Sequence, residues 1–465
     1  MTSLADKQSP EGAAGRTQRL ARGTLVFVAG VVFGKMLLLL TQLLLGRVLG
    51  PAGYGLYTLG FSLFLVVQWV ASLGLDWGVL RYCSLYRARG QPELVQRTLL
   101  SAAVLGFGSS LLVASLLAAV AGPLAEGFFA EPALAGVVRL FAVGLPFYVL
   151  MRLATTFFQS RQQYGRMTFI QHGVQPVVHL VFLLGAFALG WSLLGAVGAF
   201  LASVGLAAAL GLGLVRREMP GLTWARPERA PLRLLLRYSL GLTFIGLTYQ
   251  LLLRIPAFLL GYLGTAEQVG VYAAAANLAM VLSLTPALFA APFLPVIVEL
   301  WEKGELDELK QKYQTVVRWS LSVLLPLFLL LVLLRKEVIG LFGPQFAGGS
   351  PILVLLSVAW VVYFAKGSVA TLLDMTGRQT LDLLNLTGAA VVSIVLNIFL
   401  IPRYGALGAG LATTLAILLW AAVEYVEVRR LYRLWPWGEA VGALLAVTLV
   451  SGVLGALLYA WVAWP

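Results

Sequence analysis

Long apolar segments alternate with short polar ones along almost the whole chain of 465 residues. Segments of about 20 apolar residues have the length of a helix that crosses a bilayer. We expect helices, because lipid offers the backbone no hydrogen-bond partner and the alternation typical of membrane β-barrels is not seen. The pattern predicts about thirteen spans, at residues 24–46, 54–77, 98–121, 134–158, 168–190, 192–214, 238–262, 268–297, 315–334, 351–373, 381–401, 404–428 and 440–463.

Composition supports an integral membrane protein. Apolar residues make up 60% of the chain and charged residues only 11%, whereas a soluble domain carries about a quarter of charged residues. Residues 1–23 are too polar for the core of a secretory signal, so they are interpreted as a cytoplasmic tail before a retained first span. A single cysteine, Cys83, excludes an internal disulfide, and no Cys or His cluster has the spacing of metal ligands. We therefore expect no cofactor and no metal.

Basic residues predict the orientation in the membrane. Of the 33 Lys and Arg residues, 24 fall in the N-terminal tail and the loops on its side, and 5 fall on the opposite side. The excess of positive charge marks the cytoplasmic side, so the N-terminus is predicted to be cytoplasmic, in a multi-pass protein of the cell membrane. The same bias accounts for most of the net charge of +13, and no nucleic-acid partner is expected.

Two pairs of similar segments indicate an internal duplication. The segment GAVGAFLAS at 195–203 returns as GALGAGLAT at 405–413, and LGPAGYGLY at 49–57 returns as LGTAEQVGVY at 263–272 with one inserted residue. Both pairs are separated by nearly the same offset along the chain and begin at equivalent outer turns. Six helices is an even number, so the two halves would be parallel repeats.

The duplication predicts the domain organisation. We expect an all-α polytopic fold of two parallel-repeat six-helix bundles with one extra C-terminal helix. The predicted parts are a tail at 1–23, bundles at 24–214 and 238–430, a basic linker at 215–237 and an additional transmembrane helix at 431–465.

Three segments resemble a known family. GPAGYGLYTL, LGLDWGVLRY and NIFLIPRYGALGAGLATTLA are similar to the polysaccharide and oligosaccharide-lipid flippases of the multidrug/oligosaccharidyl-lipid/polysaccharide exporter superfamily. The resemblance implies two bundles around a central cavity and alternating access to polyprenyl-diphosphate-linked sugars. Many family members carry an acidic residue in the seventh helix, where this chain has QLLLRIPAFLLG. This departure puts cation coupling through that helix in doubt.

Cations inside the predicted spans are the candidate binding residues for a diphosphate. A charged side chain at mid-bilayer costs roughly 2.5–3.5 kcal/mol on insertion scales, so such residues usually face protein or a water-filled cavity. Arginine and lysine replace part of the hydration that a diphosphate loses, although they could instead reach the headgroup region along their own stems. These residues are Lys35, Arg254, Lys366 and Arg152. Lys35 and Arg254 occupy the first helix of each half, so both are expected to approach one diphosphate.

Neutral polar residues form a second candidate set. Gln42, Gln68, Gln250 and Asn277 are predicted to line the cavity and bind sugar hydroxyls, and the alternative is contact between helices. His172 and His179 lie seven residues apart, on one helix face. They could relay a proton or fill polar core positions.

The residues favour transport over catalysis, with two alternatives. A cation-coupled multidrug exporter of the same superfamily would favour acidic groups in the lumen, which helices 1, 7 and 8 lack before Glu299. A glycan polymerase or ligase would need a larger outer segment than the longest outer loops here, which are only AGPLAEGFFAEPA and RKEVIGLFGPQFAGGS. The expected partners are a lipid-linked sugar, membrane lipids, a polysaccharide polymerase and glycosyltransferases.

Overall fold

The regular structure of the protein is helical wherever it is described. The computed structural model describes residues 10–219, 229–285, 297, 299–367, 369, 372–373, 378–432, 435, 437 and 439–462. No strand occurs in these ranges, which confirms the all-α fold. Nine helices in this part of the chain are long and apolar enough to cross a membrane. The multi-span membrane architecture is therefore confirmed, while the total of about thirteen spans stays a prediction.

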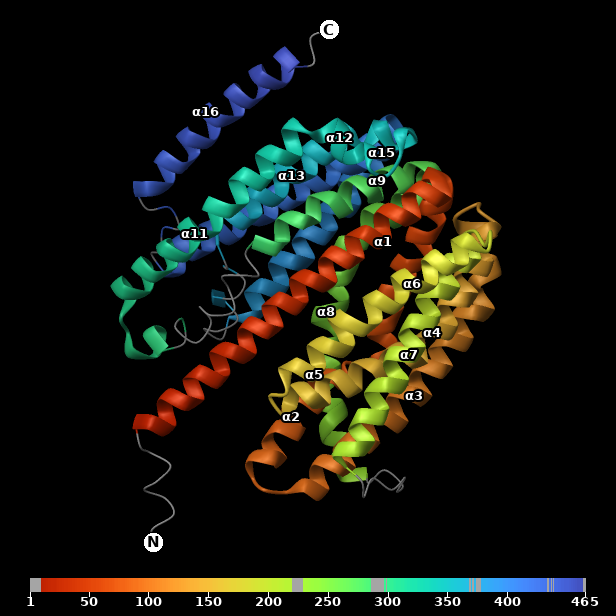
Figure 1. Cartoon of the computed structure of the whole chain (residues 1–465), viewed down its shortest axis with the longest axis vertical. Coiled ribbons are helices and arrows are strands. Elements are labelled where there is room, and N and C mark those ends of the chain that lie inside the picture. Colours follow the sequence, from red (N-terminus) through yellow and green to blue (C-terminus); the bar gives the residue numbers. More distant parts are fainter. Residues whose placement is uncertain are drawn as a thin grey trace. The chain divides into compact units, whose positions relative to one another are not determined.

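Figure 1 shows the helices of the chain. In chain order they are α1 (Pro10–Ser72), α2 (Leu75–Ala88), α3 (Pro92–Pro123), η2 (Leu124–Phe128), α4 (Ala133–Ser160), α5 (Tyr164–Thr168), η3 (Phe169–Val174), α6 (Gln175–Ala188), α7 (Leu193–Glu218), α8 (Arg229–Leu263), α9 (Ala266–Ala279), η4 (Met280–Ser283), α11 (Leu306–Leu333), α12 (Arg335–Gly340), η5 (Pro344–Gly349), α13 (Ser350–Ala365), α15 (Gln379–Tyr432) and α16 (Glu439–Val462).

A glycine interrupts each of the two longest helices and divides it into two helical segments. The apolar part of α1 has 45 residues, which would extend about 68 Å at 1.5 Å per residue, more than twice the ~30 Å hydrocarbon core. Gly50 interrupts α1 with φ 66° and is followed by Pro51, and Gly405 interrupts α15 with φ 55°. Positive φ is readily adopted by glycine. Gly50 lies between the predicted spans 24–46 and 54–77, and Gly405 is the second residue of the predicted span 404–428. Each helix is therefore long enough for two crossings.

One predicted span is interrupted. Helix α9 ends at Ala279 and continues as the short 3₁₀ helix η4, within the predicted span 268–297. Pro286, Pro292 and Pro295, which led us to expect the most distorted helix here, lie outside the described residues. Helix α2 was not predicted, because its apolar residues are interleaved with arginines and its total apolar length is too short for a span.

The chain forms two compact units. The first comprises residues 1–41, 63–124 and 135–247, and the second comprises 42–62, 125–134 and 248–465. In the first unit, the ring of Phe64 packs against Phe141, Tyr148 and Phe200 at centroid distances of 5.3–5.8 Å. A core of the second unit joins α8 and α15 through Leu252, Ile255, Leu386, Ala389, Ala390 and Trp420. The domain boundaries predicted from the sequence stay a prediction.

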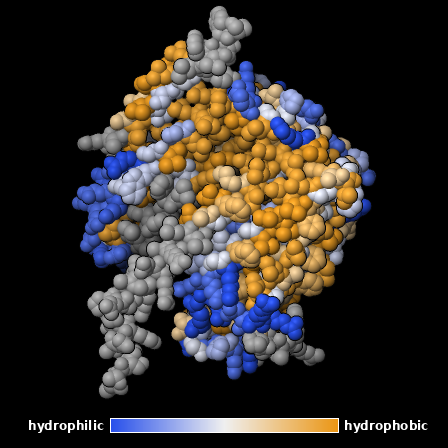
Figure 2. Space-filling view, in the orientation of Figure 1, coloured by the Kyte–Doolittle hydropathy of each residue, from blue (hydrophilic) through white to orange (hydrophobic). Residues whose placement is uncertain are grey.

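The surface is that of a protein embedded in lipid. Leu112, Leu116 and Val181 have more than half of their surface exposed, on helices α3 and α6. Figure 2 shows a broad hydrophobic expanse over the first unit's helices, with hydrophilic side chains gathered at the end where α2 and α3 join. Such an exposed apolar belt is stable only against lipid.

Candidate functional site

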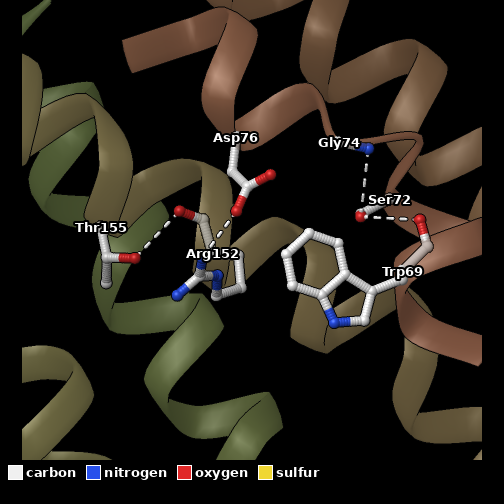
Figure 3. A network of polar contacts seen from close by, with 6 residues as sticks. All are labelled: Trp69, Ser72, Gly74, Asp76, Arg152 and Thr155. Carbon is white, nitrogen blue, oxygen red and sulfur yellow. Dashed lines mark hydrogen bonds and ion pairs between the residues drawn. The ribbon is translucent and has the colours of Figure 1, made fainter. Parts of the chain in front are cut away.

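An ion pair lies inside the first unit and holds one of the predicted cations. The Arg152 guanidinium on α4 is 2.6 Å from Oδ2 of Asp76 at the start of α2 (Figure 3). The Arg152 side chain is 32% exposed and the Asp76 side chain 10%. Charge-assisted hydrogen bonds of this length are among the stronger ones in proteins. Arg152 is therefore partly neutralised by a carboxylate of its own unit.

A tight turn between α1 and α2 positions Asp76. Leu73 and Gly74 both have positive φ, at 51° and 61°, and Ser72 Oγ accepts a hydrogen bond from the Gly74 amide at 3.4 Å (Figure 3). A Cβ on Gly74 would lie 2.6 Å from the Ser239 carbonyl oxygen of α8. Only glycine meets both conditions without strain. Asp76 then falls in the first turn of α2, where the helix dipole favours a negative charge.

Lys35 follows Gly34 on α1, where α1 packs closely against α5 and η3. A Cβ on Gly34 would lie 3.0 Å from both Cβ and the carbonyl oxygen of His172, and a Cβ on Gly30 would overlap Thr168. Two glycines four residues apart allow this contact, as in other small-residue membrane interfaces. The positive charges of Arg152 and Lys35 both interact electrostatically with His172.

A hydrogen-bonded chain of polar side chains lies in the second unit. The Tyr54 hydroxyl donates to Gln42 Oε1 at 2.8 Å and accepts from Asn277 Nδ2 at 2.8 Å. Tyr54 is fully buried and Gln42 is 8% exposed. The structure thus brings together two predicted cavity residues, Gln42 and Asn277, through a tyrosine that sequence reasoning had not singled out.

Arg254 belongs to the same unit as these hydrogen-bonded side chains. Its charge acts on the hydroxyl groups of Tyr54 and Tyr272, and the Tyr272 hydroxyl is 3.1 Å from Thr413 Oγ1. Nε of Arg254 is buried without a hydrogen-bond partner. Among the described residues, no carboxylate lies within ion-pair distance of Arg254. The second unit therefore combines an unneutralised cation with hydroxyl and amide groups.

Lys366 has different surroundings from the other cations. It is 3% exposed and forms an ion pair with the fully buried Glu424, and it also feels the charges of Asp382 and Glu427. Its Nζ lies 4.0 Å from the centroid of the Tyr363 ring. The separation between Arg152 and Lys366 along the chain is close to the offset of the repeated segments. Acids outnumber cations around Lys366, and its predicted diphosphate role stays a prediction.

The remaining predicted residues have less defined surroundings. Gln68 and Gln250 are both partly exposed. Neither side chain forms a hydrogen bond with another side chain among the described residues. His179 is buried, packs edge-to-face against Phe200 at 5.5 Å, and leaves Nε2 without a partner. Its surroundings are those of a polar residue within a helical core.

The residues missed from the sequence are Tyr54 and Tyr272, together with the pairing of Asp76 with Arg152. A signal for the tyrosines was present, because Tyr54 lies in LGPAGYGLY and Tyr272 ends LGTAEQVGVY, the two similar segments of the sequence. The ion pair joins residues 76 positions apart and has no local signature in the sequence.

Comparisons with known proteins identify relatives. The model of a family described as "Polysaccharide biosynthesis protein" matches residues 20–301. The lipid II flippase MurJ of Bacillus subtilis (strain 168) is 24% identical over 470 residues, which cover 89% of this chain and 83% of that protein.

Solved structures share the fold. A structure of the lipid II flippase MurJ in an inward closed conformation superposes with a TM-score of 0.70 at 12% identity, covering 94% of this chain and 98% of that one. An inward-facing multidrug resistance MATE family transporter of the MOP superfamily gives a TM-score of 0.68 at 16% identity, covering 86% and 94%. Identities this low concern the fold alone.

Proposed function

The chain belongs to the polysaccharide biosynthesis protein family, among the flippases of the MOP superfamily, and on this premise we propose that it moves a polyprenyl-diphosphate-linked oligosaccharide across the membrane. In this proposal the headgroup passes from the cytoplasmic to the outer leaflet by alternating access. Transport of this kind makes and breaks no covalent bond, so the residues need only bind, release and change position.

The observation that carries the proposal is the surroundings of Arg254. A half-buried arginine whose Nε has no hydrogen-bond partner, without a carboxylate partner among the described residues and near Tyr54 and Tyr272, suits an anionic group attached to a polyol. Arginine presents a planar fork that matches phosphate oxygens. The Gln42–Tyr54–Asn277 chain offers the amide and hydroxyl groups that sugars bind. We assign diphosphate binding to Arg254 and sugar contacts to the side chains of Gln42, Tyr54 and Asn277.

Lys35, in the first unit, is a second candidate for binding the diphosphate. Its charge and that of Arg152 act on His172, and Arg152 also pairs with Asp76. Positive charges attract an anionic headgroup over several ångströms in a site with restricted water. We therefore propose that Lys35 contacts the diphosphate as well.

The test is transport by the purified protein in liposomes that contain a polyprenyl-diphosphate oligosaccharide, with movement measured by enzymatic access to the sugar. Arg254→Glu and Lys35→Glu should each abolish movement, because repulsion replaces attraction, and the Gln variants should lose less. Arg254→Lys should leave a partial defect, because it keeps the charge and loses the fork. Full transport by both folded Glu variants would overturn the anionic-headgroup mechanism.

A multidrug exporter is the second candidate, because MATE family transporters share the fold. Such a protein would bind cationic compounds, and Arg254→Glu would then strengthen their binding. Titration of the same two variants with a fluorescent organic cation therefore separates the candidates.

The location and partners follow from the proposed function. We propose a cytoplasmic N-terminus, so that the substrate is received from membrane glycosyltransferases on the side with the basic loops. A polysaccharide polymerase on the outer side would consume the product.

A further inference from the structure

A polar pocket lies in the second unit, between the start of α9 and the break in α15. Residues 263–265 and Gln268 line one side of it, and residues 401–405 line the other. Its volume is about 560 Å³, within the range of small-molecule sites. Both turns fall on the side of the membrane that the basic residues predict to be the outside. We call this cavity the outer pocket.

The side chain of Gln268 brings an unsatisfied acceptor to the outer pocket. Thr265 caps α9, and its Oγ1 accepts a hydrogen bond from the Gln268 backbone amide at 3.3 Å. In the usual capping box, the glutamine side chain bonds back to the backbone amide of the capping residue. Gln268 does not complete this arrangement, because its Oε1 is buried and has no hydrogen-bond partner among the described residues.

Two glycines allow the Gln268 amide to lie in this place. A Cβ on Gly405 would lie 2.7 Å from Nε2 of Gln268, and a Cβ on Gly264 would overlap its Oε1. Gly405 also has φ 55°, a value that glycine adopts readily. A larger residue at either position would push the amide away. Both turns are therefore shaped around this one side chain.

The polar side chains of the outer pocket have no counterpart in the similar segments earlier in the chain. GALGAGLAT follows Arg403 and Tyr404, whereas GAVGAFLAS follows two leucines. LGTAEQVGVY likewise carries Glu267 and Gln268 where LGPAGYGLY has a single glycine. The sequence of such a turn therefore does not require these polar groups, which points to a role beyond the turn itself.

A sugar ring matches the donors and acceptors of the outer pocket better than an anion does. Oε1 of Gln268 needs a donor, which a phosphate diester or a carboxylate lacks at neutral pH, whereas each sugar hydroxyl both donates and accepts. Thr265 and Arg403 supply donors for other hydroxyl oxygens. The Tyr404 ring is 54% exposed and presents an apolar face to the C–H groups of a sugar.

We propose that the outer pocket binds one sugar ring of the headgroup after the headgroup has crossed the membrane. This inference rests on the proposed flippase function. Gln268 accepts a hydrogen bond from one sugar hydroxyl, and Tyr404 packs against the face of the ring. An open pocket with few contacts binds a sugar weakly, which suits a site that has to release its ligand to the outside.

Binding of free monosaccharides tests the site without any transport. The protein in nanodiscs of zwitterionic lipid is mixed with glucose, galactose, mannose, N-acetylglucosamine or rhamnose, and saturation-transfer difference NMR detects binding in the range of about 1 mM. At least one sugar should give a signal. Gln268→Leu and Tyr404→Ala should each reduce that signal about fivefold or more, because the first removes the amide and the second removes the ring.

The matched control is Glu267→Ala. Glu267 is exposed, precedes Gln268 and does not line the outer pocket, so this variant should keep the signal of the parent. A lack of signal from every sugar, or an undiminished signal in the folded Gln268→Leu and Tyr404→Ala proteins, would overturn the site. Displacement of the sugar by inorganic phosphate would overturn its assignment to a sugar, because the pocket would then prefer an anion.

A transport measurement tests the place of the outer pocket in the cycle. In the liposome assay, Gln268→Leu should slow movement of the lipid-linked sugar about threefold or more, because the arriving sugar loses a contact on the outer side. Glu267→Ala should keep the parent rate. A parent rate in Gln268→Leu would overturn the role in release. If the parent moves no such lipid, the proposed function fails, while the NMR experiment still decides whether the outer pocket binds a sugar.

Discussion

Removing one partner of the Lys366–Glu424 pair should destabilise the protein strongly. Both side chains are almost completely buried, and leaving one buried charge uncompensated typically costs about 3–5 kcal/mol. The surroundings make the cost unequal. After Glu424→Gln, Lys366 keeps the favourable charges of Asp382 and Glu427, so we expect a loss near the lower end, about 3 kcal/mol. After Lys366→Met, three carboxyl groups share one region without a cation, and we expect a loss of about 5 kcal/mol.

The double variant distinguishes a structural role from a substrate role. Lys366→Met combined with Glu424→Gln removes the unpaired charge, so its free energy of unfolding should return to within about 1–2 kcal/mol of the parent. If the pair is only structural, this variant should also transport the lipid-linked sugar. Loss of transport with restored stability would instead assign Lys366 to the diphosphate, as the sequence predicted.

The Arg152–Asp76 pair in the first unit is the control. Arg152 is about one-third exposed, so solvent screens its charge, and Asp76→Asn should cost only about 1–2 kcal/mol. Denaturant unfolding in detergent, followed by tryptophan fluorescence, measures all the variants. The reasoning fails if Asp76→Asn is as damaging as Lys366→Met, or if the double variant is no more stable than the worse single one.

Three further variants test contacts within one unit. Tyr54→Phe removes a hydroxyl that makes two hydrogen bonds, and it should lower the free energy of unfolding by about 1–3 kcal/mol and slow transport. An unchanged free energy of unfolding and an unchanged transport rate would exclude a role for these hydrogen bonds. Gly74→Ala should destabilise more than Gly90→Ala, since both have positive φ but only Gly74 meets neighbouring atoms, and equal melting shifts would contradict this. Gly34→Leu should disrupt the first unit while Gly241→Leu, in open space, should not, as judged by gel-filtration profiles.

The sequence was sufficient for the fold because the bilayer imposes a simple rule. Apolar runs of span length have to be helical in lipid, and the observed helices α3, α4, α7 and α16 begin and end within a few residues of their predicted spans, except at polar extensions. The break at Gly50 falls between two predicted spans, whereas the break at Gly405 comes just after the predicted boundary, at the second residue of the span 404–428. Helix α2 was missed because a short helix of 14 residues with interleaved arginines carries no such run.

The site was less predictable, because its contacts are long-range. The presence of cations within spans identified Arg152, Arg254, Lys366 and Lys35, but spacing along the chain could not show which of them had carboxylate neighbours. Arg152 finds Asp76 on a helix that was not predicted, and Lys366 finds Glu424 in the second leg of α15. Cations that look alike in the sequence therefore differ in their partners. Arg152 and Lys366 are paired with carboxylates, whereas Arg254 has no carboxylate partner among the described residues.

The grouping of residues 42–62 with the C-terminal unit has a consequence for how the chain can be divided. Leu45, Tyr54 and Leu59 are fully buried there, so a polypeptide beginning at residue 229 would lack part of its own interior. Its partner fragment, ending at residue 219, would carry those side chains without the surface that covers them. The repeat is thus a unit of sequence but not of folding. Fragments of this kind should be degraded when produced singly and should accumulate only when both are synthesised in the same cell.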